Sequence, residues 1–177
     1  ALGRAAALTA NVLQYGKSEE PPPQKTRVAL DAALAGAAED AGLTPDGVRL
    51  EAEIPARFGL MADGDQLHRI LVNLMRNARQ AIESDPGRAP ERRGKGTIIV
   101  SAFVDDGVSV VRLSDDGPGI PPRLAERLFE PFVSSKSSEG TGLGLTISRE
   151  LAALHGGELR LVEPVGAGAT FELRLPL

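Results

Sequence analysis

The most regular hydrophobic pattern in the chain lies between residues 63 and 83. Apolar residues recur there at intervals of three and four, at Leu67, Ile70, Leu71, Leu74, Ala78, Ala81 and Ile82. This spacing places them on one face of an α-helix, and Asp63 is a residue type that caps helix N-termini. The pattern therefore predicts a long amphipathic helix that begins at Asp63 and ends near Glu83.

Alternating apolar and polar residues predict strands at 48–54, 57–61, 97–104, 108–113, 158–162 and 169–175. The alternation in the first of these is typical of an antiparallel strand. Further helices are expected at 30–41, near Leu128, and from a glycine run at 140–144 to His155. This order of elements predicts an α/β sandwich, in which one helical layer covers a mostly antiparallel, mixed sheet.

The chain divides into three consecutive parts. Residues 1–20 carry an apolar stripe that predicts one amphipathic helix, and the helix lacks a capping residue at its start. A charged, proline-containing stretch follows, and we interpret residues 21–26 as a linker. The third part, residues 27–177, is expected to be one globular domain.

Composition excludes several function classes. The 177 residues contain no cysteine and two histidines, so disulfides and cysteine-rich zinc sites are excluded. The formal net charge of -4 argues against nucleic-acid binding, and the basic loop at 88–95 is expected to be solvated. No apolar run is long enough to cross a bilayer, which predicts a soluble domain.

Three segments could carry chemistry. Asn73 and Asn77 lie four residues apart on the predicted helix and offer amide oxygens to a divalent cation, although paired surface amides are common. Residues 113–121 combine Asp115 with glycines and prolines, a composition that also suits an ordinary turn. The glycines at 140–144 precede a helix, where backbone amides favour phosphate, but a glycine-rich loop alone is weak evidence.

Together these segments resemble the ATP-binding domain of sensor histidine kinases. The matching motifs are the N box at 73–82, the G1 box at 115–119, the F box at 128–132, the G2 box at 140–144 and the last strand at 168–176. All four boxes occur in the family's order. The resemblance implies the Bergerat fold, which histidine kinases share with gyrase, Hsp90 and MutL.

The resemblance also implies the roles of individual residues. Asn77 would ligate Mg²⁺, and Asn73 would support the metal and the phosphates of ATP. Asp115 would hold the adenine amino group, with Thr170 beside it. The adenine pocket and a mobile lid would be formed by Gly117, Gly119, Lys136, Gly140, Thr141, Gly142, Leu143 and Gly144.

The lid has its own implied features. Phe129 and Phe132 would anchor its first end. The lid at 132–140 is short, and Gln80 replaces a basic residue of many relatives, as in nitrogen-regulation and oxygen-sensing kinases.

One substitution separates branches of this superfamily. Hydrolytic members carry a glutamate four residues before the metal-binding asparagine, whereas this chain has Asn73, and a carboxamide cannot act as a general base. We therefore expect ATP to be held without rapid hydrolysis. The γ-phosphate would be transferred to a histidine on a hairpin domain that is absent from this chain, since neither His68 nor His155 has the acidic neighbour of a phosphoacceptor histidine.

The expected partners follow from the same resemblance. The helix at 1–20 resembles the end of the dimerisation and phosphoacceptor hairpin, through which a response regulator would be reached. The full-length protein would be a homodimer, whereas the fragment given by this sequence could be a monomer. The domain would be cytoplasmic, whether or not the parent is membrane-associated. Two alternatives stay open: a degenerate kinase module that binds a partner, and a serine kinase of the anti-sigma type, against which Asn73 argues.

Overall fold

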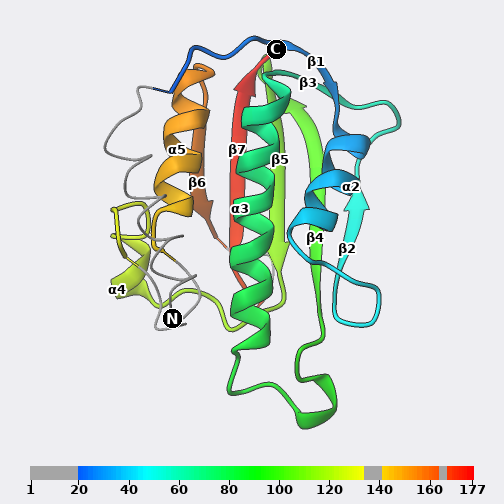
Figure 1. Cartoon of the computed structure of the whole chain (residues 1–177), viewed down its shortest axis with the longest axis vertical. Coiled ribbons are helices and arrows are strands. Elements are labelled where there is room, and N and C mark those ends of the chain that lie inside the picture. Colours follow the sequence, from blue (N-terminus) through cyan, green and yellow to red (C-terminus); the bar gives the residue numbers. More distant parts are fainter. Residues whose placement is uncertain (1–19, 134–140, 164–166) are drawn as a thin grey trace, which may run out of the picture.

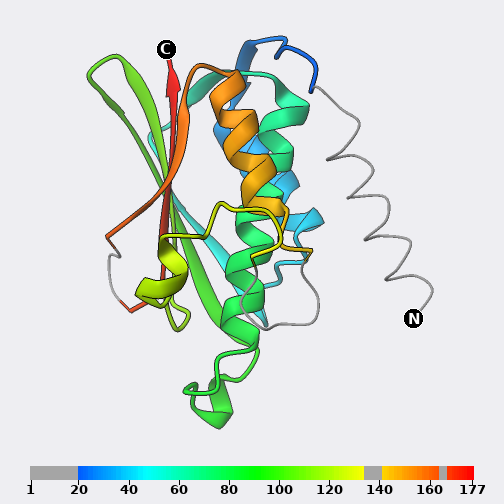
Figure 2. The same cartoon turned by 90° about the vertical axis from the view of Figure 1, so that its left-hand side faces the viewer.

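The computed structural model describes residues 20–133, 141–163 and 167–177 as two layers, with helices on one face of a sheet (Figures 1 and 2). The sheet contains, in spatial order, β2 (Val48–Glu53), β4 (Gly96–Asp105), β5 (Val108–Asp115), β7 (Thr170–Pro176) and β6 (Glu158–Val162). The helices that cover it are α2 (Leu30–Asp40), α3 (Gly64–Glu83) and α5 (Gly144–Leu154). The predicted α/β sandwich is confirmed.

Helix α3 is the centre of the helical layer and lies between α2 and α5 (Figure 1). The side chain of Asp63 accepts hydrogen bonds from the backbone N–H groups of Asp65 and Gln66, each at 3.1 Å, as expected of a cap. The predicted apolar face is buried except at Ala81, which is only partly covered. This exception matters because Ala81 borders the candidate site.

The pairing of β2 corrects one expectation. The strand was expected to be antiparallel, but it runs parallel to β4, with Leu50 opposite Ile98. Alternating apolar and polar residues indicate that one face of a strand is buried and the other is exposed. An edge strand such as β2 can have one exposed face whether it runs parallel or antiparallel to its neighbour, so the alternation does not reveal its direction. The other three pairings in the sheet are antiparallel, so the sheet is mixed, as predicted.

A separate two-stranded sheet joins β1 (Thr26–Ala29) to β3 (Gly59–Ala62). The hydrophobic pattern did not predict β1, because four residues with one partly buried side chain carry little periodicity. Just before β1, the side chain of Gln66 donates to the backbone oxygen of Pro21 at 2.9 Å. The guanidinium of Arg69 binds Glu20 through two hydrogen bonds of 2.9 and 3.0 Å. The predicted linker is thus held against α3.

Two shorter predictions need comment. The helix expected near Leu128 is instead α4 (Pro122–Ala125), and turns follow it to Phe132. Proline at a first helical position favours this earlier start. The helix predicted over residues 1–20 lies, except for Glu20, outside the described residues. Within the described part of the chain, no helix has the length and apolar character needed to cross a membrane.

Candidate nucleotide-binding site

One face of α3 borders both glycine loops that the sequence singled out. Asn73, Asn77 and Ala81 follow one another at intervals of four residues and therefore share this face. A Cβ atom on Gly144 would lie 3.5 Å from Cγ of Asn73, and a Cβ atom on Gly117 would lie 3.6 Å from Cβ of Ala81. Asn77 is thus placed between the start of α5 and the turn after β5.

The two asparagines have different surroundings. The amide nitrogen of Asn73 donates to the backbone oxygen of Gly144 at 3.2 Å and to the hydroxyl of Ser148 at 3.1 Å. These bonds tie α3 to α5. Asn77 is partly buried, and its side chain makes no hydrogen bond to another residue in the described part of the chain. Its amide group is therefore available to a ligand.

Asp115 ends β5 and has one carboxylate oxygen in use. Its Oδ1 accepts from the backbone N–H of Gly117 at 2.8 Å and more weakly from that of Ala169 at 3.4 Å. Its Oδ2 accepts no hydrogen bond from the described residues. Burial raises the pKa of Asp115, while these two N–H groups oppose that shift. The free oxygen of a half-buried carboxylate can accept a hydrogen bond from a donor such as an exocyclic amine.

Close backbone contacts surround Asp115 and require glycine. A Cβ atom on Gly168 would collide with the backbone oxygen of Asp115, and one on Gly117 would lie 2.8 Å from Oδ1 of Asp115. Gly119 has a φ of +78°, which glycine adopts readily. The sequence singled out Gly117 and Gly119 but gave Gly168 no role at the site. The available signal was a glycine directly before a predicted strand.

Thr170 lies on β7, opposite the residue that precedes Asp115. It is fully buried, and its hydroxyl shares a 2.9 Å hydrogen bond with that of Ser114. Ser114 and Thr170 are paired residues of β5 and β7, so the sheet brings Thr170 next to the strand that ends at Asp115.

The structure describes the start of the predicted lid, at residues 132 and 133, and the chain that follows the lid from Thr141. Lys136 and Gly140 lie outside the described residues. The ring of Phe129 packs edge-on against Phe171 at a centroid distance of 6.4 Å, whereas 57% of Phe132 is exposed. The backbone N–H of Phe132 donates to the oxygen of Gly142 at 3.0 Å. Phe132 and Gly142, which lie on either side of the segment outside the described residues, are therefore adjacent.

Gly142 is restricted to glycine by its φ of +70° and by the backbone of Phe132, which a Cβ atom would approach to 2.7 Å. Thr141 and Leu143 flank it: the hydroxyl of Thr141 accepts a long hydrogen bond of 3.4 Å from the backbone N–H of Leu143, and the Leu143 side chain is buried. The lid thus returns to the domain at a constrained point, directly before the start of α5.

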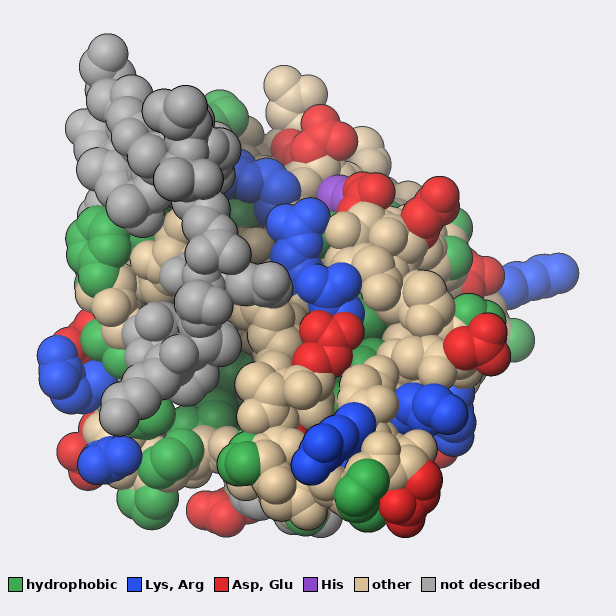
Figure 3. Space-filling view, turned by 60° about the horizontal axis from the view of Figure 1, so that its bottom comes forward, with side chains coloured by type: hydrophobic (Ala, Val, Ile, Leu, Met, Phe, Trp, Pro, Cys, Tyr) green, Lys and Arg blue, Asp and Glu red, His purple; other side chains and the backbone are tan. Residues whose placement is uncertain are grey.

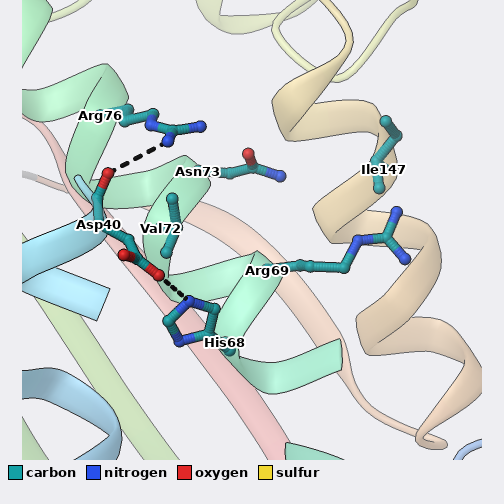
Figure 4. Close-up of a pocket in the computed structure, with 7 residues that line it drawn as sticks. All are labelled: Asp40, His68, Arg69, Val72, Asn73, Arg76 and Ile147. Carbon is teal, nitrogen blue, oxygen red and sulfur yellow. Dashed lines mark hydrogen bonds and ion pairs between the residues drawn. The ribbon is translucent and has the colours of Figure 1, made fainter. Parts of the chain in front are cut away.

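A hollow of about 320 Å³ reaches Asn73 from a different direction (Figure 4). Its other lining residues come from α2, α3 and α5 and include Asp40, His68, Arg69, Arg76 and Ile147. It does not include Asp115 or either glycine loop. We therefore assign it no part in adenine binding.

Both histidines are engaged in structural contacts. Nδ1 of His155 donates to the backbone oxygen of Leu151 at 2.7 Å, and Nε2 accepts from the N–H of Asp63 at 3.0 Å. These bonds fit a neutral, fully buried ring. His68 is partly buried, and its Nε2 lies 2.7 Å from Oδ2 of Asp40. Burial shields His155 from a phosphoryl group, whereas His68 has an acidic partner that comes from α2 and not from a neighbouring position in the sequence.

The site is compatible with a magnesium ion that shares its ligands with a nucleotide. Mg²⁺ usually keeps several waters and takes one or two protein oxygens together with phosphate oxygens. The unpaired side-chain amide of Asn77 would supply one such oxygen. Among the described residues, no group of three or more His, Cys, Asp or Glu side chains could form a metal site by itself.

Comparisons with known proteins identify the family of this chain. Residues 62–177 match the family model described as "Histidine kinase-, DNA gyrase B-, and HSP90-like ATPase". The two-component sensor PprA of Pseudomonas aeruginosa is 39% identical over 77% of this chain and 15% of its own length. The sensory histidine kinase/phosphatase NtrB of Rhodobacter capsulatus is 31% identical over 98% of this chain and 49% of its own.

A solved structure extends the similarity to three dimensions. Full-length ShkA in complex with AMPPNP superposes with a TM-score of 0.73 at 26% identity, over 98% of this chain and 36% of that protein. The chain spans half or less of the length of these relatives. The family match and the arrangement of Asn77, Asp115 and the two glycine loops lead to one conclusion: the chain belongs to the histidine kinase-, gyrase B- and HSP90-like ATPase family and is a domain of the histidine kinase type.

Proposed function

We propose that this domain binds Mg-ATP between α3, the turn after β5 and the start of α5, and that it presents the γ-phosphate to a histidine on another domain. The observation that carries this proposal is the position of Asn77, which lies unpaired between the two glycine loops. The AMPPNP in the related ShkA structure is consistent with a nucleotide ligand.

Each residue then has a defined task. Asp115 accepts the exocyclic amine of adenine through its free Oδ2, and Gly117, Gly119 and Gly168 allow the ring to approach the backbone. Asn77 holds Mg²⁺, which when bound would stabilise charge on the phosphates. The N–H groups at the start of α5 point toward the phosphates, where a helix N-terminus favours negative charge. Lys136 and Gly140 are assigned to the lid by resemblance alone.

The surroundings of Asn73 support transfer to a partner rather than hydrolysis. Its amide nitrogen is occupied by Gly144 and Ser148, and an amide has no basic group that could remove a proton from water. The bound ATP therefore waits for an external nucleophile. In the full-length protein this would be a histidine of a dimerising hairpin, which would pass the phosphoryl group to a response regulator.

Calorimetry with Mg-ATP tests the site. We expect Asp115→Ala to weaken binding about a hundredfold and Asn77→Ala about tenfold, because each removes a hydrogen bond or ligand in a partly buried site. Asp46→Ala is the control, since this exposed aspartate makes no hydrogen bond within the described residues. Unchanged affinity in both site variants would exclude the proposed site.

A second experiment tests the transfer. We expect the domain, joined to a hairpin that carries its phosphoacceptor histidine, to form an acid-labile phosphoprotein from labelled ATP. The isolated domain should bind ATP without becoming labelled. A joined protein that binds ATP but is never labelled would favour the alternative of a degenerate binding module.

A further inference from the structure

The loop between α3 and β4 contains a buried arginine. The side chain of Arg88 is only 6% exposed, although its neighbours Arg92 and Arg93 are exposed. The solvated loop expected from the sequence is therefore wrong for this residue. On the face that Figure 3 brings forward, Lys and Arg side chains lie among Asp and Glu side chains. The burial of Arg88 in a loop of otherwise exposed arginines calls for an explanation.

Arg88 reaches the turn that carries Asp115. Its Nη2 donates to the backbone oxygen of Asp116 at 2.6 Å and to Oδ1 of the same residue at 3.0 Å, and its Nη1 donates to the backbone oxygen of Lys95 at 2.8 Å. Asp116 is held from the other side by β4, because its Oδ1 accepts from the N–H of Thr97 at 3.1 Å. One arginine therefore joins the loop to the end of β5.

The contact to the backbone of Asp116 affects Asp115 through a single peptide group. The carbonyl of Asp116 and the N–H of Gly117 belong to one planar, trans peptide unit, whose two ends point in opposite directions. Arg88 binds the oxygen end at 2.6 Å, and the N–H end donates to Oδ1 of Asp115 at 2.8 Å. When Arg88 holds the carbonyl of Asp116, the direction of the Gly117 N–H is also fixed. Because this N–H donates to Oδ1 of Asp115, the orientation of the Asp115 carboxylate is fixed with it.

We propose that Arg88 is a positioning residue for the nucleotide site, which holds the peptide between Asp116 and Gly117 so that the free oxygen of Asp115 faces the adenine. The assignment of adenine rests on the function proposed above. Burial raises the pKa of Asp115, and the charge of Asp116, which pairs with Arg88 and Arg92 at 3.0 and 3.2 Å, raises it further. The positive charge of Arg88 acts in the opposite direction and lowers the pKa of Asp115.

The test compares Arg88→Ala, Arg88→Lys and the control Arg93→Ala, which removes an equal charge from an exposed position in the same loop. We expect ADP affinity, measured by calorimetry, to fall about tenfold in Arg88→Ala and less than twofold in Arg93→Ala. Amide hydrogen exchange at Gly117 without nucleotide should accelerate at least tenfold in Arg88→Ala only. Arg88→Lys keeps the charge, but its single nitrogen cannot replace both Nη2, which binds the two oxygens of Asp116, and Nη1, which binds Lys95.

The lysine variant separates positioning from charge. We expect Arg88→Lys to fold, as thermal unfolding will show, and still to lose protection at Gly117 and several-fold in ADP affinity. Wild-type protection at Gly117 and wild-type affinity in both Arg88 variants would overturn the proposal. If the wild-type domain bound no nucleotide, the proposed function would fail, and unchanged exchange at Gly117 would separately overturn the positioning role.

Discussion

Asp115 and Glu172 are two carboxylates on adjacent strands with opposite environments. Glu172 is fully buried and accepts hydrogen bonds from Arg112, Arg160 and Arg174 at 2.7, 2.6 and 3.2 Å. Burial alone would raise its pKa, but these three arginines lower it to about 2. Asp115 receives two backbone N–H groups on one oxygen, and burial raises its pKa.

The difference separates a structural charge from a functional one. Glu172 joins three strands, because Arg112 of β5 and Arg160 of β6 lie directly opposite it in the sheet. Its hydrogen-bonding capacity is filled within the protein. Asp115 has an oxygen left over and a charge that folding does not favour, which is typical of a group that awaits a ligand. The following predictions test this contrast.

The largest effect is expected for Glu172→Gln. Loss of the charge should lower the free energy of unfolding by about 2 kcal/mol at pH 7, because three arginines lose their common anion. The affinity for Mg-ATP should stay within twofold of the wild type. Urea denaturation and calorimetry measure the two quantities. A stable variant with impaired binding would reverse the assigned roles.

Asp115→Asn should have the opposite pattern. Removal of a charge that burial disfavours should leave the nucleotide-free domain as stable as the wild type or more stable at pH 7. ATP affinity should fall about tenfold, because a neutral amide is a weaker acceptor than a carboxylate. Reduced stability together with unchanged affinity would show that Asp115 is a structural residue.

The pH dependence of these two stability differences provides a sharper comparison. The pKa of Glu172 is lowered from 4.5 to about 2, so its stabilisation is complete above pH 4.5 and disappears as the pH falls toward 2. The pKa of Asp115 is raised above 3.8, so its cost exists above the folded pKa and disappears as the pH falls through it. Denaturation of both variants from pH 7 to 3 should give differences of opposite sign: the Asp115 difference should disappear by pH 3.8, whereas the Glu172 difference should begin to fall only below pH 4.5 and persist at pH 3.

The smallest effect is expected for Arg160→Met. About half of the Arg160 side chain is exposed, and Glu172 keeps two other arginines after its removal. The free energy of unfolding should therefore fall by less than about 1 kcal/mol. A loss as large as that of Glu172→Gln, measured by urea denaturation, would mean that one pair rather than the network stabilises the sheet.

The sequence-based predictions were accurate for features set by residues close together in the sequence, and they failed for features set by residues far apart. Helix α3, its Asp63 cap and the strand β6 depend on local periodicity and capping, and the structure agrees with the prediction for each. The parallel pairing of β2 and the existence of β1 depend on partners far along the chain, and periodicity does not report those partners. The position of α4 depended on a proline at its start.

At the candidate site, the sequence by itself determined the residue types: amides on one helix face, a carboxylate after a strand, and glycines where the backbone needs them. Only the tertiary structure decided which of these groups are occupied. It commits the amide nitrogen of Asn73 to α5, leaves Asn77 and one oxygen of Asp115 available, and buries Arg88 behind the turn. The physical reason is that a hydrogen bond depends on direction and distance, which become defined only when remote segments pack together.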